Sequence, residues 1–409
     1  MSWEIHIDWQ GRTELLGRLH AADRGPAVSF EYATAWLKRA DAFSLDPTLL
    51  PLQPGVQHSR FLLGALQDCG PDRWGRILIE RAVRKQVLDQ KPYRDIDYVL
   101  ALDDHSRLGA LRFRRDATSP FLAVSTGKLP PLIRLQALLR AADAVHANTD
   151  TAADLRFLLG AGSPLGGARP KSAVSLADGR LALAKFPKPD DTRDIAAGEI
   201  LALTLAAAAG IHVVEHRLVA VGEHSVALIT RFDRAGEVRI PFLSGASLLG
   251  LSADDPGAYT RLADGIRQFG HNVAGDLQEL WRRLVFSLLA SNYDDHLRNH
   301  GFLMHVAGRW SLSPAYDLNP VPEIDRVHTN KTPMSEDHIK PNIAHALDVA
   351  PRFGLKPAVA KTILREVFVA VSAWRTAGRK LRIKAATLDA YASAFEHELM
   401  DEARKLLAK

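Results

Sequence analysis

Polar residues of catalytic type gather in one short segment, SNYDDHLRNHGF (291–302), between an apolar helix pattern and an apolar run typical of a strand. Four residues separate Asp294 from Asn299, which is the D-x4-N spacing of a phosphotransferase catalytic loop. In such loops the aspartate accepts the proton of the attacking hydroxyl and the asparagine holds a metal ion. The spacing therefore predicts Asp294 as a catalytic base and Asn299 as a Mg²⁺ ligand.

A second acidic position follows at Asp317, in the stretch AYDLNP, 18 residues after Asn299 and across a predicted hairpin. Mg²⁺ takes hard oxygen ligands and is usually held by one or two side chains together with phosphates and water. Asn299 and Asp317 meet that requirement. The structural alternative is that Asn292 and Asp294 cap a helix and that Asp317 belongs to a turn.

A lysine and a glutamate lie upstream in an order that suits a nucleotide site. The run LALAKF alternates Leu181, Leu183 and Lys185 onto one face of a strand. Glu199 stands in the first half of the next predicted helix. Protein kinases hold a strand lysine with a helix glutamate so that the amine meets the nucleotide phosphates. A lysine at a sheet edge, unrelated to Glu199, is the alternative.

The segment before this strand, GAGSPLGGARPKS (160–172), is rich in glycine and carries Arg169 and Lys171. Glycines let backbone N–H groups approach a phosphate, and successive amides can form an anion nest. The segment lacks the spacing of a Walker A motif, and it does not open a helix as the dinucleotide fingerprint does. A phosphate-binding loop and a plain surface loop both remain open.

Other polar residues have simpler explanations. His296 and His300 have the i, i+4 spacing of zinc ligands, but their segment is typical of a loop and lacks a third ligand. Asp295 is a rival base, although only Asp294 has the spacing to Asn299. The basic stretch RTAGRKLRIK (375–384) fits a solvated helix face, with contact to nucleic acid or a partner as the alternative.

The composition is that of a globular protein of two or three domains, with 409 residues, 47% hydrophobic and 24% charged. A formal charge of +5 tolerates an anionic partner such as a nucleotide without demanding one. The single cysteine, Cys69, excludes an intramolecular disulfide and any multi-cysteine metal site. The N-terminal stretch has no apolar signal core, and no apolar run reaches about 18 residues, so we expect a cytoplasmic protein.

The predicted elements change in character along the chain. Residues 1–118 mix strand alternation with short helices, and 131–159 has helical spacing. A hairpin that turns at Asp178-Gly179, a helix and a further strand pair follow. From about residue 236 the strand signal fades and helices dominate, apart from one hairpin. The pattern predicts an α+β fold in which two unlike lobes enclose a cleft.

Taken together, these motifs make the chain resemble the HipA family, the serine/threonine kinase toxins of bacterial type II toxin–antitoxin modules. FEYATAWL and LQDCGPDRWGR resemble the family's first subdomain, GGARPKSAV its ATP loop, LALAKFP its strand lysine and LITRFDR its hinge. NYDDHLRNHGF followed by LSPAYDLNP resembles its most recognisable pair of motifs. The resemblance covers nearly the whole chain and implies a bilobal, protein-kinase-like fold. An extra N-terminal subdomain would occupy 1–118, a strand-rich N-lobe 119–235 and a helical C-lobe 236–409.

Carried over position by position, the resemblance implies Asp294 as the proton acceptor and Asn299 and Asp317 as Mg²⁺ ligands. Lys185 would contact the ATP phosphates with Glu199 as its partner. The backbone of Thr230 and Phe232 would meet adenine. The whole set of ATP-binding residues that it implies is Gly166, Gly167, Ala168, Arg169, Pro170, Lys171, Lys185, Thr230, Phe232, His296, Asn299, Tyr316 and Asp317.

The sequence departs from the family's pattern in the ATP loop. Many members carry a serine there that is autophosphorylated and ejects the loop. Ser163 is the nearest candidate here, but Pro164 takes the slot when the glycines are aligned from Gly167. Arg169 and Pro170 also stand where many relatives carry Gln-Glu.

The resemblance also implies partners. Members act with a small helix-turn-helix antitoxin of HipB type, which binds operator DNA and holds the kinase inactive. We therefore expect such an antitoxin as a separate chain, DNA contact only through it, ATP and Mg²⁺ as cofactors, and no membrane. A protein is the expected substrate, and aminoacyl-tRNA synthetases are one target type of the family. Two alternatives are a catalytically idle pseudokinase that acts as a co-repressor with the antitoxin on DNA, and a small-molecule phosphotransferase of the aminoglycoside-kinase type.

Overall fold

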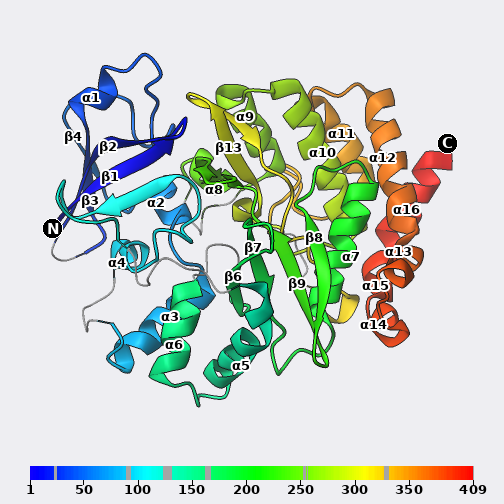
Figure 1. Cartoon of the computed structure of the whole chain (residues 1–409). Coiled ribbons are helices and arrows are strands. Elements are labelled where there is room, and N and C mark those ends of the chain that lie inside the picture. The colour runs from blue at the N-terminus through cyan, green and yellow to red at the C-terminus, as the bar shows by residue number, and fades with distance from the viewer. Residues whose placement is uncertain are drawn as a thin grey trace.

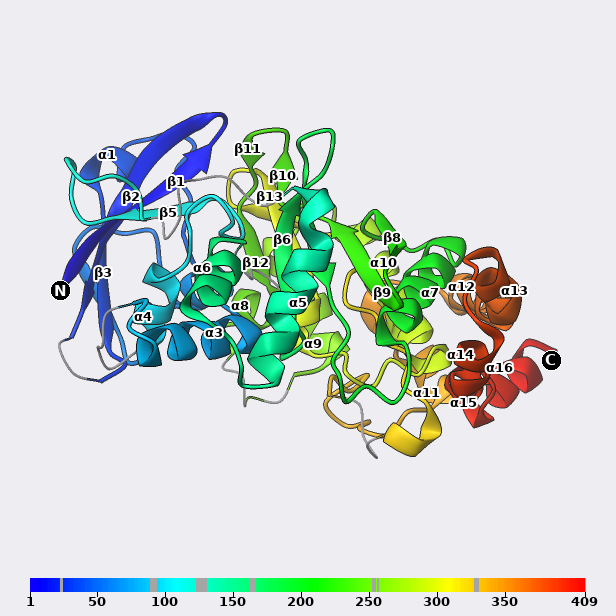
Figure 2. The same cartoon turned by 60° about the horizontal axis from the view of Figure 1, so that its bottom comes forward.

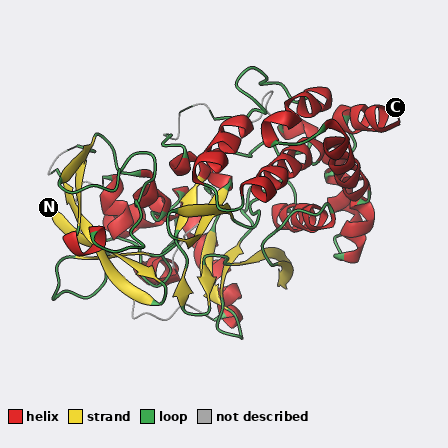
Figure 3. Cartoon of the chain, turned by 90° about the horizontal axis from the view of Figure 1, so that it is seen from above, coloured by secondary structure: helices red, strands yellow, loops and turns green. Residues whose placement is uncertain are grey.

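The computed structural model describes residues 1–22, 25–88, 94–122, 131–161, 167–251, 255, 257–326 and 331–408. Strands gather toward the N-terminal end and helices toward the C-terminal end (Figures 1 and 3). The α+β class expected from the sequence is confirmed. Within the described residues, no helix combines the length and the apolar character that crossing a bilayer requires.

The N-terminal part is built on an antiparallel sheet of order β4-β3-β2-β1-β5. Alternation places Trp3, Ile5, Ile7 and Trp9 of β1 in the core, because successive side chains of a strand point to opposite faces. The strands are β1 Ser2–Trp9, β2 Arg12–Ala21, β3 Val28–Tyr32, β4 Val56–Ser59 and β5 Leu111–Arg114, and the helices are α1 Thr34–Leu37, α2 Gly64–Asp68, α3 Arg73–Arg84 and α4 Asp95–Leu100.

A second antiparallel sheet has the order β6-β7-β9-β8. Its strands are β6 Lys171–Ser175, β7 Leu181–Lys185, β8 His216–Val221 and β9 His224–Thr230. The hairpin predicted at Asp178-Gly179 is confirmed: it joins β6 to β7, and Gly179 has the positive φ of 83° that such a turn favours.

Helices cover both faces of this second sheet. One face packs through Ala182 and Ala184 on α3, α5 (Leu135–His146) and α6 (Ala152–Ala161), which lie together beside β6 in Figure 2. The other face packs through Leu183 and Ile229 on α7 (Ile195–Ala208). Because side chains alternate along β7, Lys185 shares the face of Leu183 and points toward α7.

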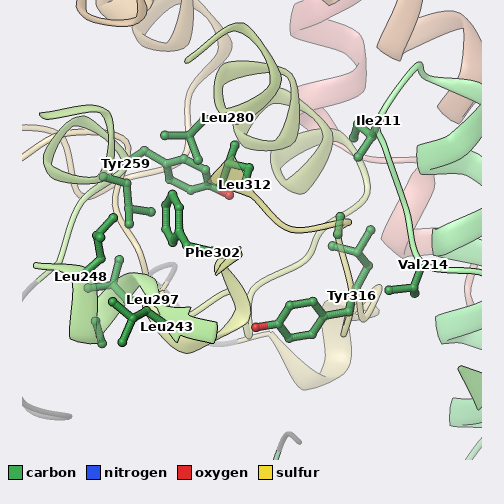
Figure 4. Packing of buried hydrophobic residues seen from close by; sticks show 14 of the residues in the cluster. Ile211, Val214, Leu243, Leu248, Tyr259, Leu280, Leu297, Phe302, Leu312 and Tyr316 are labelled. Atoms are coloured by element: carbon green, nitrogen blue, oxygen red, sulfur yellow. The ribbon is translucent and has the colours of Figure 1, made fainter. Parts of the chain in front are cut away.

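The C-terminal part surrounds a three-stranded sheet of order β12-β13-β14 with helices. Leu280, Phe302 and Leu312 belong to its core, together with Tyr259 and Leu297 (Figure 4). The sequence predicts the β13–β14 hairpin, which is confirmed, but not β12, because three residues are too few to show alternation. The strands are β10 Arg234–Ala235, β11 Val238–Arg239, β12 Phe242–Ser244, β13 Gly301–Val306 and β14 Arg309–Leu312, and the helices are α8 Gly245–Leu248, α9 Tyr259–Phe269, α10 Val273–Leu289, α11 Ile343–Val349, α12 Pro357–Ser372, α13 Trp374–Lys380, α14 Ala385–Ala390, α15 Ala392–Phe395 and α16 Glu398–Ala408.

Three of the four sheets formed by the described residues each lie within one predicted part, whereas the two-stranded sheet of β10 and β11 spans the limit at residue 235. Strands β1–β5 fall within 1–118, β6–β9 within 119–235, and β12–β14 within 236–409. The boundaries themselves stay a prediction.

A buried ionic network joins the N-terminal part to the exit of β9. The Arg231 guanidinium donates to the carbonyl of Arg107 at 3.0 Å and to Asp233 Oδ1 at 2.7 Å. Asp233 is fully buried and accepts from the amide of Gly109 at 2.8 Å. Burial alone would raise the pKa of Asp233, but Arg231 and Arg234 outweigh it and lower that pKa to about 2. The motif LITRFDR therefore connects the N-terminal part to the segment after β9 through buried hydrogen bonds.

Replacing Asp233 by alanine should destabilise the chain strongly. Two guanidinium groups would lose their buried counter-ion, and breaking a buried pair from one side costs about 3–5 kcal/mol. We expect chemical denaturation to show a loss of free energy of unfolding in that range. Asp264→Ala removes exposed pairs with Arg267 and Arg352, each worth at most about 1 kcal/mol, and should cost clearly less. Equal losses in the two variants would contradict the role of burial.

Candidate active site

Lys185 is the centre of a buried ionic cluster. Its Nζ lies 2.6 Å from Glu199 Oε1 on α7 and 2.6 Å from Asp317 Oδ1, after β14. Burial alone would lower the pKa of Lys185, but the two carboxylates reverse this and raise it above its usual range. The amine therefore stays charged at neutral pH, and the structure contains the predicted Lys185–Glu199 pair.

Asp317 is held in a conformation that few residues other than glycine adopt. Its φ is 55°, in the left-handed region where Asp and Asn are enriched. Asn319 Nδ2 donates to its Oδ1 at 3.2 Å. Burial would raise the pKa of Asp317, yet Lys185 outweighs burial and holds that pKa well below its usual range. Asp317 is thus an ionised carboxylate on a strained backbone, a combination that occurs at functional sites.

The D-x4-N segment forms a loop in which the asparagine side chain hydrogen-bonds to the backbone of the aspartate. Asn299 ends a 3₁₀ turn, Leu297–Asn299, and its Nδ2 donates to the backbone carbonyl of Asp294 at 3.3 Å. Asn299 is buried, whereas the Asp294 side chain is 52% exposed and forms an ion pair with Lys331. The predicted base therefore stands where a second molecule could reach it.

The neighbouring Asp295 has a structural position instead. It is buried, lies 3.1 Å from His300 Nε2, and accepts from the Ser287 hydroxyl at 3.2 Å and from the Tyr259 hydroxyl. Burial would raise the pKa of Asp295, but the contacts with His300 and Tyr259 lower it. Asp295 and His300 therefore face the core of the C-terminal part.

A pocket of about 780 Å³ joins the separate motifs. It brings together the glycine-rich segment, Lys185, Asp294 and Asp317, whereas Asn299 is not among its lining residues. Its lining residues are Gly167, Ala168, Arg169, Lys171, Lys185, Arg193, Ile195, Glu199, Asp294, Asp317, Asn319, Pro320, Val321 and Tyr391.

Both cations of the glycine-rich segment have protein partners. The Arg169 guanidinium donates to the two carboxylate oxygens of Asp191 at 2.6 and 2.7 Å. Lys171 is buried, forms an ion pair with Asp72, and donates to the carbonyl of Gly167 at 3.1 Å. These contacts hold the segment in one conformation. The two positively charged side chains remain beside the pocket.

An apolar recess of about 370 Å³ adjoins Lys185. The rings of Phe232 and Tyr316 stack there, with centroids 5.2 Å apart and planes inclined by 28°. The Tyr316 hydroxyl donates to the carbonyl of Arg298 at 2.8 Å, and the Thr230 amide donates to the carbonyl of Glu215 at 2.8 Å. The recess is lined by Leu183, Lys185, Glu199, Ile229, Thr230, Arg231, Phe232, Tyr316 and Asp317.

The remaining predicted residues lie around these two hollows. His296 and Asn299 line a neighbouring hollow of about 670 Å³, which shares Gly167 with the main pocket. Pro170 is buried, and its carbonyl accepts from the amide of Phe186 at 2.8 Å. Gly166 and the candidate autophosphorylation site Ser163 lie outside the described residues.

Several lining residues are not predicted from the sequence. Arg193 lies before α7, and its guanidinium carbon is 5.5 Å from the ring centroid of Tyr391, which follows α14. No spacing rule connects two residues so far apart in the chain. Asn319 is different, because it follows Asp317 in the same motif and could have been chosen as a second polar position.

The two predicted Mg²⁺ ligands each keep an oxygen that suits this cation, but Asn299 lines the hollow beside His296 and Asp317 lines the main pocket. The side-chain nitrogen of Asn299 donates to the carbonyl of Asp294. The side-chain oxygen of Asn299 therefore remains available to accept a hydrogen bond or to bind a metal ion. Asp317 is ionised and offers a carboxylate. Amide and carboxylate oxygens fit this cation, and phosphate oxygens usually complete its coordination.

Comparison with known sequences places these motifs in a family. The family model described as the HipA-like C-terminal domain matches residues 163–374, more than half of the chain. A Haemophilus influenzae protein that carries a provisional kinase name is 29% identical over 156 residues, which are 34% of this chain and 46% of that protein. The provisionally named kinase Y4dM of Sinorhizobium fredii is 35% identical over 144 residues, 31% of this chain and 34% of that protein. Both matches span less than half of the relative's length.

Among solved structures, the fold is shared with HipA of Shewanella oneidensis MR-1, determined in a complex with HipB and operator DNA. The TM-score is 0.72, the identity is 18%, and the match covers 98% of this chain and 97% of the other. The likeness confirms the fold expected from the resemblance. The residues matched by the family model include Lys185, Asp294, Asn299 and Asp317. On this evidence the chain belongs to the HipA-like C-terminal domain family.

Proposed function

We propose that this chain is an ATP- and Mg²⁺-dependent serine/threonine protein kinase and the toxin of a HipA/HipB-type toxin–antitoxin module. The observation that carries the proposal is the pocket in which Lys185, Asp317 and Asp294 meet. Family membership and the provisional kinase names of two relatives support the same activity.

The two hollows suit the two halves of a nucleotide. The recess beside Phe232 and Tyr316 offers an aromatic, apolar wall to adenine. The phosphates would then extend past Lys185, whose charged amine can exchange a carboxylate partner for a phosphate oxygen. Mg²⁺ bound by Asn299 and Asp317 would neutralise charge on the phosphates. Binding and orientation of this kind supply most of the catalysis in phosphoryl transfer.

Asp294 would act at the acceptor. Its carboxylate accepts the proton of a serine or threonine hydroxyl while that oxygen forms a bond to the γ-phosphorus. The bond between the γ-phosphorus and its bridging oxygen breaks, and ADP leaves with the electron pair. The half-exposed position of Asp294 at the rim favours an acceptor carried on another protein over one enclosed in the pocket.

The partner and the substrate that we propose are those implied by the resemblance to the HipA family. A HipB-like helix-turn-helix antitoxin would bind as a separate chain and make the contacts to operator DNA, as the Shewanella protein was solved with HipB and its operator. The substrate would be a cytoplasmic protein, with aminoacyl-tRNA synthetases as one target type. Autophosphorylation of Ser163 belongs to the same proposal.

The direct test is phosphoryl transfer by the wild-type chain. With γ-labelled ATP and Mg²⁺, we expect label in proteins of a bacterial lysate, and chelation of Mg²⁺ should abolish the transfer. Label that enters an aminoglycoside but never a protein would favour a small-molecule phosphotransferase. If calorimetry detects no binding of ATP–Mg²⁺ while the antitoxin still binds, the chain is a pseudokinase co-repressor.

A further inference from the structure

We propose that Asp72 and Trp74, at the start of α3, are positioning residues for the phosphate side of the nucleotide site. Both lie in the N-terminal part, about 100 residues before the segment that they hold. The inference rests on the proposed function, because it concerns the same pocket. It gives the N-terminal part a defined task in nucleotide binding.

The two carboxylate oxygens of Asp72 have different partners. Oδ1 accepts from the amide of Gly75 at 2.8 Å and so caps the N-terminus of α3. Oδ2 contacts the amine of Lys171, whose side chain is 1% exposed. The helix cap fixes the orientation of the carboxylate, and the carboxylate in turn fixes a buried cation that lines the pocket.

Trp74 holds the backbone of the same segment at two points. Its indole Nε1 donates to the carbonyl of Lys171 at 3.1 Å, and its amide donates to the carbonyl of Gly167 at 3.4 Å. The side chain is buried and stacks on His146, with centroids 6.1 Å apart. Both ends of the stretch from Gly167 to Lys171 therefore depend on α3.

The register of the sheet explains why Lys171 needs a counter-ion of its own. Lys171 of β6 pairs directly with Lys185 of β7, so the two amines share one face. Like charges at directly opposite positions destabilise a sheet. Glu199 and Asp317 are engaged by Lys185, and Asp72 balances Lys171. Without Asp72, Lys171 would repel Lys185 and compete with it for Asp317.

Two substitutions test this role, and the comparison of KM with kcat separates it from the stability that Asp72→Asn also costs by leaving Lys171 buried without its counter-ion. Asp72→Asn keeps a good helix cap, since Asn and Asp are equivalent at that position, but removes the charge that faces Lys171. Trp74→Phe keeps an aromatic ring and removes the donor to the Lys171 carbonyl. We expect each to raise KM for ATP–Mg²⁺ about tenfold, with kcat within about twofold of wild type, because the lost contact acts on binding. Calorimetric Kd for ADP–Mg²⁺ should rise by the same factor.

Asp95→Asn is the matched control in the same part of the chain. It removes an exposed pair with Arg76, 2.9 Å apart, and should change neither KM nor Kd. Unchanged KM and Kd in both test variants would overturn the inference, as would a fall in melting temperature and kcat with KM unaltered. Failure of the proposed function looks different, because the wild-type chain itself would then bind no nucleotide.

Discussion

Asp294→Asn should lower the rate of phosphoryl transfer by about 10²–10⁴-fold, the usual contribution of a general base, and leave nucleotide binding intact. Asparagine has the same shape but cannot take up a proton at neutral pH. The ion pair of Asp294 with Lys331 is half-exposed, and such pairs contribute at most about 1 kcal/mol, so the fold should be unaffected. Single-turnover transfer from labelled ATP and calorimetry with ADP–Mg²⁺ measure the two quantities separately.

Two further substitutions make this result specific. Asp264→Asn changes an exposed carboxylate in α9 that forms ion pairs with Arg267 and Arg352, and transfer should stay at the wild-type rate. Asp295→Asn removes the buried charge beside His300, so it should lower the melting temperature. Wild-type transfer by Asp294→Asn would refute its assignment as the base.

The parts of the site that the sequence predicts are those in which local spacing determines geometry. The two-residue period of β7 directs Lys185 toward α7, and the hairpin between Asn299 and Asp317 brings the second motif back beside the first. The D-x4-N spacing lets the Asn299 side chain reach the carbonyl of Asp294. Each relation spans at most a few tens of residues, so residue types and periodicity are enough to propose it.

The parts that the sequence does not predict depend on tertiary packing. The resemblance places Lys171 among the residues along the nucleotide, and the sequence gives no sign of its buried contact with Asp72, which depends on how α3 packs on the central sheet. Arg169 is also engaged by a protein partner, Asp191. The pocket wall formed by Tyr391 comes from the C-terminal helices, and neither charge nor spacing in the sequence marks it.

Asp317→Asn should remove the Mg²⁺ dependence of nucleotide binding and lower the rate of transfer by about 10³-fold or more. Stabilisation by a catalytic metal is worth several kcal/mol, and each 1.36 kcal/mol is tenfold in rate. Asparagine tolerates the left-handed φ of 55° as aspartate does, so this substitution adds no backbone strain. The buried Lys185–Glu199 pair, 2.6 Å apart, also remains neutral overall, so the apo protein should fold normally.

Other substitutions in the ionic cluster around Lys185 would lower stability as well as activity, so a loss of activity could not be assigned to function alone. Asp317→Ala adds backbone strain, and Lys185→Met leaves Glu199 and Asp317 buried without their cation, which is strongly destabilising. Glu199→Gln is the useful comparison, because Lys185 keeps Asp317 and any Mg²⁺ dependence should survive in weakened binding. Titration of Mg²⁺ against ADP binding distinguishes the two variants. If Asp317→Asn binds ADP with the Mg²⁺ dependence of the wild type, the metal is held by other residues and the site must be reassigned.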